Sequence, residues 1–445
     1  MRGLGLFAAV SINIANMIGT GIFLKTRVMT CNVGTPGLVL LVWVVAGLLA
    51  LAGALTYSEL AAMMPDAGGG YVFLREAYGR RWGFLYGWTL FFVARTGSQA
   101  ALAVGSAIFL NIVTGGALNG PYRLQAVALV FIWIITLLNC ASVKVSGAAV
   151  SLLTVIKASL VLGVGAGAVL FAKGDWGHLL LANLQGTCEG VAASARGGFA
   201  GFGAAMLGAL WAYDGWENVA PLAGEVKNPR RNIPLAFIGG MFVVGGLYIF
   251  VNSAYFYVLT PTEIASVSST SSVASAVASR FLGPAAVVLI GVALLTSSVG
   301  ALHSSILANS RTPFAMARDG LFFKGLSRIS PGARVPRNAL LAQGAWASVL
   351  ALSGSYDVIT DYVIFASWLL YGMTAASVFV FRRRYPNAER PYRTWGYPVV
   401  PVLFLLVTGW LLVNTLITNP QRAFMGLLLM ILGLPFYEYW SRRSS

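Results

Sequence analysis

The residues that point to chemistry begin with Ile18-Gly19-Thr20-Gly21, in the middle of the first apolar segment, residues 4–30. Glycine is a poor helix former and adopts backbone angles that other residues avoid, so we predict a break in the helix here. Backbone groups freed at membrane depth are tolerated only where protein or a wet cavity surrounds them. The amides of Gly19, Thr20 and Gly21 would attract a carboxylate at the start of the outer half-helix, and the carbonyl of Ile18 would accept from an ammonium.

A second interruption is predicted at residues 211–216, inside the apolar segment 199–223. Here the carbonyls of Trp211, Ala212 and Asp214 would also accept from an ammonium. Donors for a carboxylate on one side and acceptors for an ammonium on the other fit an α-amino acid. Glycines that only allow close helix packing are the alternative, and the matching position of the second break favours a binding site.

Two cations lie inside predicted membrane spans, Lys157 in residues 146–172 and Arg95 in residues 83–112. A charge at that depth is costly and should have partners. Lys157 is expected either to hold a fixed positive charge at a coupling site or to release a proton, with snorkelling to an interface as the alternative. Arg95 is expected to pair with Asp214 or Glu217, or to line the pathway.

Large aromatic side chains flank the second break. Trp211 is placed to close over a bound substrate, although packing in the core is the more common fate of a membrane tryptophan. His303, in the span 285–311, either relays protons or is held by an ordinary hydrogen bond.

The composition is that of an integral membrane protein. Of the 445 residues, 58% are hydrophobic and 10% are charged, against about 25% charged in soluble domains. Each crossing of the bilayer needs about 20 apolar residues. We predict twelve membrane helices, at residues 4–30, 37–63, 83–112, 122–141, 146–172, 199–223, 234–258, 285–311, 337–353, 357–381, 398–418 and 423–440.

The positive charges predict the orientation of these helices. With the N-terminus inside, the cytoplasmic segments hold 21 of the 30 Lys and Arg residues, and the outer segments hold seven, Lys25 and Arg27 among them. Cytoplasmic loops carry the excess of Lys and Arg, so both termini are predicted to be cytoplasmic, in the plasma membrane. The net charge of +16 lies in loops and not in one basic stripe, which argues against nucleic acid. The three cysteines have no metal or redox spacing, and no metal or cofactor is expected.

The layout predicts an internal repeat, because the first and sixth spans are both interrupted. Five spans per half place the second half upside down relative to the first, which is typical of transporters. Residues 1–381 would form a ten-helix transport core from repeats at 1–172 and 199–381, and residues 382–445 would add a cytoplasmic loop and two helices.

Five motifs, in order, resemble those of the amino acid–polyamine–organocation superfamily of transporters. They lie at residues 18–23, 211–216, 224–234, 315–320 and 390–398. The L-type amino acid transporter branch is the most similar, since Lys157 matches its fifth-helix lysine and residues 95–99 match its third-helix pattern.

This resemblance implies an all-α fold with a LeuT-like five-plus-five inverted repeat and discontinuous helices 1 and 6. It implies sodium-independent amino acid transport, usually by exchange. Thr20 and Gly21 would meet the substrate carboxylate. Lys157 would replace a sodium ion and touch Gly19 and the hydroxyl of Ser297. The amino group would be met by Ile18, Trp211, Ala212 and Asp214.

Two departures from the family pattern affect these expectations. Residues 114–123 lack the cysteine that bonds animal members to a glycoprotein, so no disulfide-linked heavy subunit is expected. Asp214 stands where many relatives have a small residue, which bears on the substrate range.

The function predicted from the sequence is therefore an exchanger of neutral L-amino acids that works by alternating access. A proton-coupled symporter that uses Lys157 is the alternative within transport. A non-transporting amino acid sensor and a channel are alternatives of other classes, and no enzyme motif is present.

Overall fold

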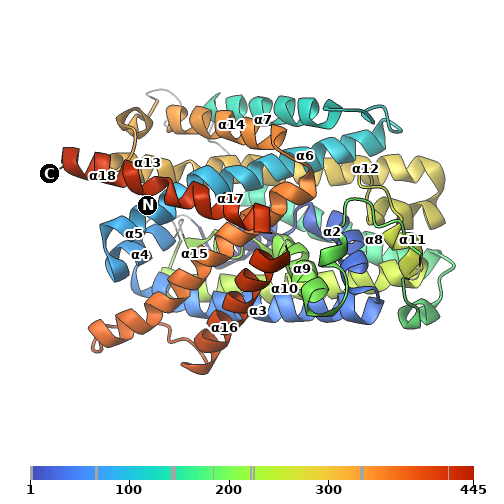
Figure 1. Ribbon diagram of the computed structural model, residues 1–445, viewed down its shortest axis with the longest axis horizontal. Coiled ribbons are helices and arrows are strands. Elements are labelled where there is room, and N and C mark those ends of the chain that lie inside the picture. The colour runs from blue at the N-terminus through green and yellow to red at the C-terminus, as the bar shows by residue number, and fades with distance from the viewer. Residues whose placement is uncertain are drawn as a thin grey trace.

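The computed structural model describes residues 4–65, 69–141, 147–183, 185–220, 223, 226–330, 335–418 and 420–444. The motif predicted at residues 224–234 begins outside these residues. The regular secondary structure of the described residues is helical apart from an isolated bridge between Leu4 and Val226. Figure 1 shows a bundle of long helices, with both termini, α4 (Gly70–Tyr78) and α13 (Arg311–Arg318) at one end and α11 (Pro261–Ala265) at the other.

Nine helices in the described residues are long and apolar enough to cross a membrane, or ten if the bent pair α1 (Leu6–Met17) and α2 (Gly21–Val33) is one span. Two further predicted spans hold helices of 16 residues each, α9 (Gly198–Tyr213) and α14 (Arg337–Leu352). The chain is therefore an all-helical membrane protein. The spanning helices are α3 (Pro36–Met63), α5–η1–α6 (Arg80–Val113), α7 (Arg123–Ala141), α8 (Gly147–Phe171), α10 (Pro229–Val258), α12 (Val273–Asn309), α15 (Tyr356–Arg384), α16 (Val399–Thr418) and α17–α18 (Pro420–Ile431 and Gly433–Ser444).

The break predicted in the first span is confirmed. Helix α1 (Leu6–Met17) ends before Ile18, whose ψ of 88° leaves the helical range, and α2 (Gly21–Val33) continues at an angle of 43°. The non-helical residues 18–20 lie between the two halves.

The second interruption begins later than predicted. Trp211 and Ala212 still belong to α9, and the first extended residue is Asp214, with ψ 147°. Gly215 follows at φ +99°, a backbone conformation that other residues rarely adopt. The helix continues to Tyr213 because residues 211–213 can all adopt helical backbone angles. Of residues 211–216, only Gly215 has the positive φ that favours glycine.

The two interrupted elements pack against each other inside a shell of longer helices. Helix α2 lies along α9, α1 lies along α10 and α8, and α12 lies along α6. This packing brings the break after α1 next to the break after α9, although they lie almost 200 residues apart in the chain.

Candidate substrate site

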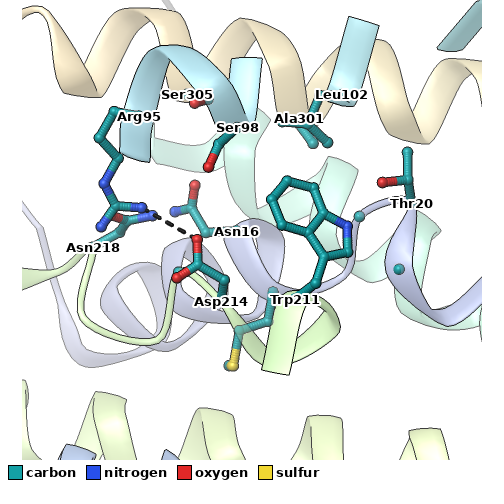
Figure 2. A pocket seen from close by; sticks show the side chains of 14 residues that line it. Asn16, Thr20, Arg95, Ser98, Leu102, Trp211, Asp214, Asn218, Ala301 and Ser305 are labelled. Carbon is teal, nitrogen blue, oxygen red and sulfur yellow. Dashed lines mark ion pairs between the residues drawn. The ribbon is translucent and has the colours of Figure 1, made fainter. Parts of the chain in front are cut away.

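A small buried cavity lies between the two breaks. Its volume is about 40 Å³, room for about three water molecules. Figure 2 shows the side chain of Trp211 between Thr20 on one side and Arg95, Asp214 and Asn218 on the other. The lining residues are Asn16, Met17, Gly19, Thr20, Gly21, Arg95, Ser98, Leu102, Trp211, Asp214, Gly215, Asn218, Ala301 and Ser305.

The first break presents unpaired backbone amides to this cavity. Thr20 is 1% exposed, and its carbonyl accepts from Phe23 and Leu24 in the first turn of α2. Among the described residues, the amides of Gly19, Thr20 and Gly21 donate to no hydrogen-bond acceptor. A buried amide without a partner is costly, so these three donors suit an anionic ligand group at a helix N-terminus.

Close contact between α2 and α9 requires glycine at position 21. A Cβ added there would lie 2.6 Å from the Cα of Ala212, a backbone atom that has no rotamer to change. A Cβ at Gly105 of α6 would likewise lie 2.5 Å from Cγ2 of Thr20. The missing side chains thus allow three helices to converge on Thr20.

Tyr248 of α10 connects the two breaks from behind. Its hydroxyl lies 2.8 Å from the carbonyl oxygen of Met17, at the end of α1, and 2.9 Å from that of Ala212, near the end of α9. A phenol has one proton, so it serves the two carbonyls in turn. Helix ends leave carbonyls unsatisfied, and this buried tyrosine compensates for two of them.

A hydrogen-bonded chain closes one side of the cavity. The indole N–H of Trp211 donates to the hydroxyl of Tyr356 over 2.7 Å, and that hydroxyl lies 2.8 Å from Oγ1 of Thr20. An indole nitrogen can only donate, so the Tyr356 proton is free to go to Thr20. Trp211 was predicted as a gate, whereas Tyr356, the first residue of α15, was not predicted.

An ion pair lies directly behind this chain. Nζ of Lys25 lies 2.6 Å from Oδ1 of Asp357 and 2.6 Å from Oγ1 of Thr360, and Arg27 approaches the other carboxylate oxygen at 3.4 Å. The side chain of Lys25 is 1% exposed, that of Asp357 30%. Lys25 and Arg27 are thus buried in α2, and assigning them to an outer segment missed this pairing. Two cations that follow the first break so closely could have indicated a buried carboxylate partner.

The other side of the cavity holds a second charged cluster. Arg95 pairs with Asp214 at 3.5 Å and with Glu217, and the hydroxyl of Tyr371 donates to Asp214 over 2.7 Å. The three charged side chains are all less than 9% exposed. Arg95 therefore pairs with both carboxylates that the sequence analysis considered, and it also lines the cavity.

Lys157 is buried outside the cavity wall. Its Nζ donates to the carbonyl of Ala15 in α1 over 3.5 Å, and it lies near Gly300 of α12. The structure gives it no hydrogen bond to Gly19, and the buried hydroxyl of Ser297 has no partner among the described residues. Lys157 thus connects α8 to the end of α1, one turn before the break.

The cysteines form a disulfide that the sequence analysis missed. Cys31, near the end of α2, is bonded to Cys188 in the segment between α8 and α9. The side chain of Asn32 donates to the carbonyl of Ala195 in the same segment, and Arg27 donates to that of Glu189. Since 157 residues separate the two cysteines, their spacing gave no sign of the bond.

A small polar cavity between broken helices, inside a helical membrane protein, defines the class of transporters that carry small solutes. The chain belongs to the amino acid permease family, whose model matches residues 4–434. It is an amino acid transporter and not an enzyme.

Relatives of known name agree with this family. The chain is 31% identical to the serine/threonine exchanger SteT of Bacillus subtilis, over 100% of this chain and 98% of the relative. It is 31% identical to the mouse b(0,+)-type amino acid transporter 1, over 98% of this chain and 87% of the relative. It is 30% identical to the human large neutral amino acids transporter small subunit 2, over 99% of this chain and 81% of the relative. All three span nearly the whole chain.

Proposed function

We propose that the protein is a sodium-independent exchanger of neutral L-amino acids, working by alternating access. The observation that carries this proposal is the set of three buried, unpaired amides at Gly19, Thr20 and Gly21. They meet the carboxylate of the substrate, helped by the N-terminal dipole of α2.

The ammonium group is placed on the opposite side of the same cavity. The carbonyl of Asp214, which lines the cavity, accepts from it, and so does the carbonyl of Ile18, which lies in the chain between the lining residues Met17 and Gly19. The carbonyls of Trp211 and Ala212 already accept from the Asp214 amide and from Tyr248, and each retains a second lone pair for the substrate. Both ends of a zwitterion therefore find partners on two neighbouring broken helices.

The substrate side chain is small, polar and uncharged. The lining of the cavity supports this. It includes the amides of Asn16 and Asn218 and the hydroxyls of Thr20, Ser98 and Ser305, and Asp214 is already paired with Arg95. A cavity of about 40 Å³ holds less than a whole amino acid, so it must widen around the substrate, and a small side chain needs the least widening. The name of the relative that exchanges serine and threonine agrees with this size and polarity.

Lys157 supplies a fixed positive charge beside the first break, in the place where a coupling sodium ion would sit. Its hydrogen bond to Ala15 at the end of α1 supports this role, and Ser297 completes the proposed site. A carrier with a permanent charge there needs no sodium gradient. A proton-coupled symporter, in which Lys157 releases its proton, remains the competing mechanism.

The proposed architecture is twelve spans in the plasma membrane, with two inverted five-helix repeats and discontinuous helices 1 and 6. Both termini are cytoplasmic. The 21 Lys and Arg residues on that side support this orientation. The Cys31–Cys188 disulfide, on the opposite side, supports it independently, since disulfides persist in oxidising compartments. Because these two cysteines bond to each other, we propose that the carrier works without a disulfide-linked heavy subunit.

Transport assays with purified protein in sodium-free proteoliposomes test the proposal. Uptake of labelled L-serine should be strongly stimulated when the vesicles contain unlabelled L-serine or L-threonine, and Lys157→Ala should lose this stimulation. Uptake driven uphill by a pH gradient into vesicles without internal amino acid would reject exchange in favour of proton coupling. Binding of L-serine without any transport would identify a sensor.

A further inference from the structure

A second cavity lies away from the substrate site, at the end of the molecule that holds both termini. It is a groove of about 890 Å³, within the size range of ligand sites. One wall is the segment after α13 and the other is α18. Both α13 and α18 lie at the end of the molecule that holds the termini (Figure 1). The lining residues are Gly320, Phe322, Phe323, Lys324, Gly325, Pro435, Phe436, Tyr439 and Trp440.

Aromatic side chains form the floor and walls of this groove. The ring of Trp440 lies 5.4 Å from that of Phe322 and 5.0 Å from that of Phe323. Phe323, Phe436 and Tyr439 are 43–53% exposed, although burial of such large rings is worth a few kcal/mol each. Exposed rings gathered around one hollow indicate a surface that an apolar ligand covers.

The groove also has a cation at its edge. Lys324 is exposed, and the structure gives it no acidic partner among the described residues. It belongs to the segment 311–337, which holds six Lys and Arg residues. A ligand for this groove therefore combines a negative group with a hydrocarbon part.

The depth of the groove in the membrane identifies the source of such a ligand. Trp440 lies near the end of the last apolar span, Ala423–Arg442, so the groove opens where lipid headgroups meet their acyl chains. With both termini cytoplasmic, as proposed above, this is the cytoplasmic leaflet, where basic pockets attract anionic headgroups.

We propose that this groove binds one anionic phospholipid of the cytoplasmic leaflet. The phosphate lies at Lys324, and an acyl chain lies against Phe323, Phe436 and Trp440. A free phosphate ion would use the lysine alone and leave the aromatic wall exposed. The lipid would join the loop after α13 to the C-terminal helix α18.

Native mass spectrometry of the purified full chain tests this proposal without any transport measurement. Phosphatidylglycerol should be retained in preference to phosphatidylcholine. Lys324→Gln should weaken its binding about fivefold, the effect expected of one lysine near the membrane surface. Lys227→Gln, an exposed lysine on the same side, should bind as the parent does. Equal retention of the two lipids, or equal loss in both variants, would reject the site.

A fluorescence measurement tests the acyl chain separately. Phosphatidylglycerol with brominated acyl chains should quench a component of the emission that Trp440→Phe removes, and brominated phosphatidylcholine should quench it less. Phe323→Ser should also weaken lipid retention, since Phe323 is exposed and its replacement leaves the core unchanged. The proposal would be overturned if the brominated lipid caused no quenching, or if millimolar inorganic phosphate displaced the bound lipid. It would also be overturned if the parent formed a dimer that dissociated in Phe323→Ser, since a second copy would then cover the groove.

Discussion

The hydroxyl of Tyr356 lies 2.7 Å from the indole nitrogen of Trp211. These residues come from the start of α15 and the end of α9, and the same hydroxyl reaches Thr20 at the start of α2. One side chain thereby holds together the three elements that close one side of the cavity. Opening that side requires the breaking of both hydrogen bonds.

Replacement of Tyr356 by phenylalanine should therefore favour the state that is open to the outside. The ring is kept, but Trp211 and Thr20 lose a buried partner, at a cost of about 1–3 kcal/mol for each unsatisfied group. The open population should rise about tenfold or more. The measurement is the rate at which an impermeant thiol reagent, added outside, labels Ser98→Cys in the cavity of a Cys140→Ser chain.

The control for this labelling experiment is Tyr122→Phe, an exposed tyrosine that should leave the rate unchanged. An unchanged rate in Tyr356→Phe as well would mean that the chain of hydrogen bonds does not hold the cavity closed.

The ion pair between Lys25 and Asp357 should matter for stability as well as for gating. Asp357→Asn leaves the buried ammonium of Lys25 without its counter-charge. We expect this to lower the free energy of unfolding by about 2–3 kcal/mol. The loss is smaller than in a fully buried pair because the side chain of Asp357 is 30% exposed. The apparent melting temperature in detergent should fall. Lys25→Met together with Asp357→Leu should restore part of it, since the buried ammonium is removed while Arg27 keeps its hydrogen bond to the carbonyl of Glu189. A double variant less stable than Asp357→Asn would contradict this account.

Gly21→Ala should abolish exchange while the protein still inserts and folds. The added methyl would meet the backbone of Ala212 at 2.6 Å, so α2 and α9 must separate by more than a side-chain adjustment. Gly37→Ala in α3 is the matched control, because nothing lies within 4 Å of a Cβ there. Counterflow of L-serine in proteoliposomes measures both variants. Full exchange in Gly21→Ala would mean that the tight contact is not needed.

Removal of Arg95 should change which substrates are accepted. In Arg95→Met, Asp214 and Glu217 lose their cation, and the cavity wall gains negative charge. We expect L-lysine to compete at least about tenfold better against labelled L-serine, equivalent to about 1.4 kcal/mol of added attraction. Arg95→Met with Asp214→Asn should lose this gain. If L-lysine competes equally in all three proteins, Arg95 does not set the charge preference.

Local residue chemistry was enough to predict part of this site. The break after Met17 was predictable because Gly19 and Gly21 interrupt an apolar run whose backbone must otherwise be helical. The second break was displaced, because Trp211 and Ala212 are compatible with helix and only Gly215 requires a positive φ. The two cations after the break were visible in the sequence, but their partner was not, because Asp357 lies 332 residues away from Lys25 in the chain.

The Cys31–Cys188 disulfide should couple α2 to the segment before α9. Cys31 lies on α2, which carries Gly21 of the site, and the hydrogen bonds from Arg27 and Asn32 to this segment support the same connection. An impermeant phosphine added outside should therefore slow exchange severalfold, as α2 loses a covalent restraint on its movement. Cys31→Ser should respond no further to the phosphine, and Cys140→Ser should respond as the parent does. Because the phosphine must reach the outer face, proteoliposomes with the carrier inserted in the reverse orientation should not respond; if they alone respond, the proposed membrane orientation is wrong.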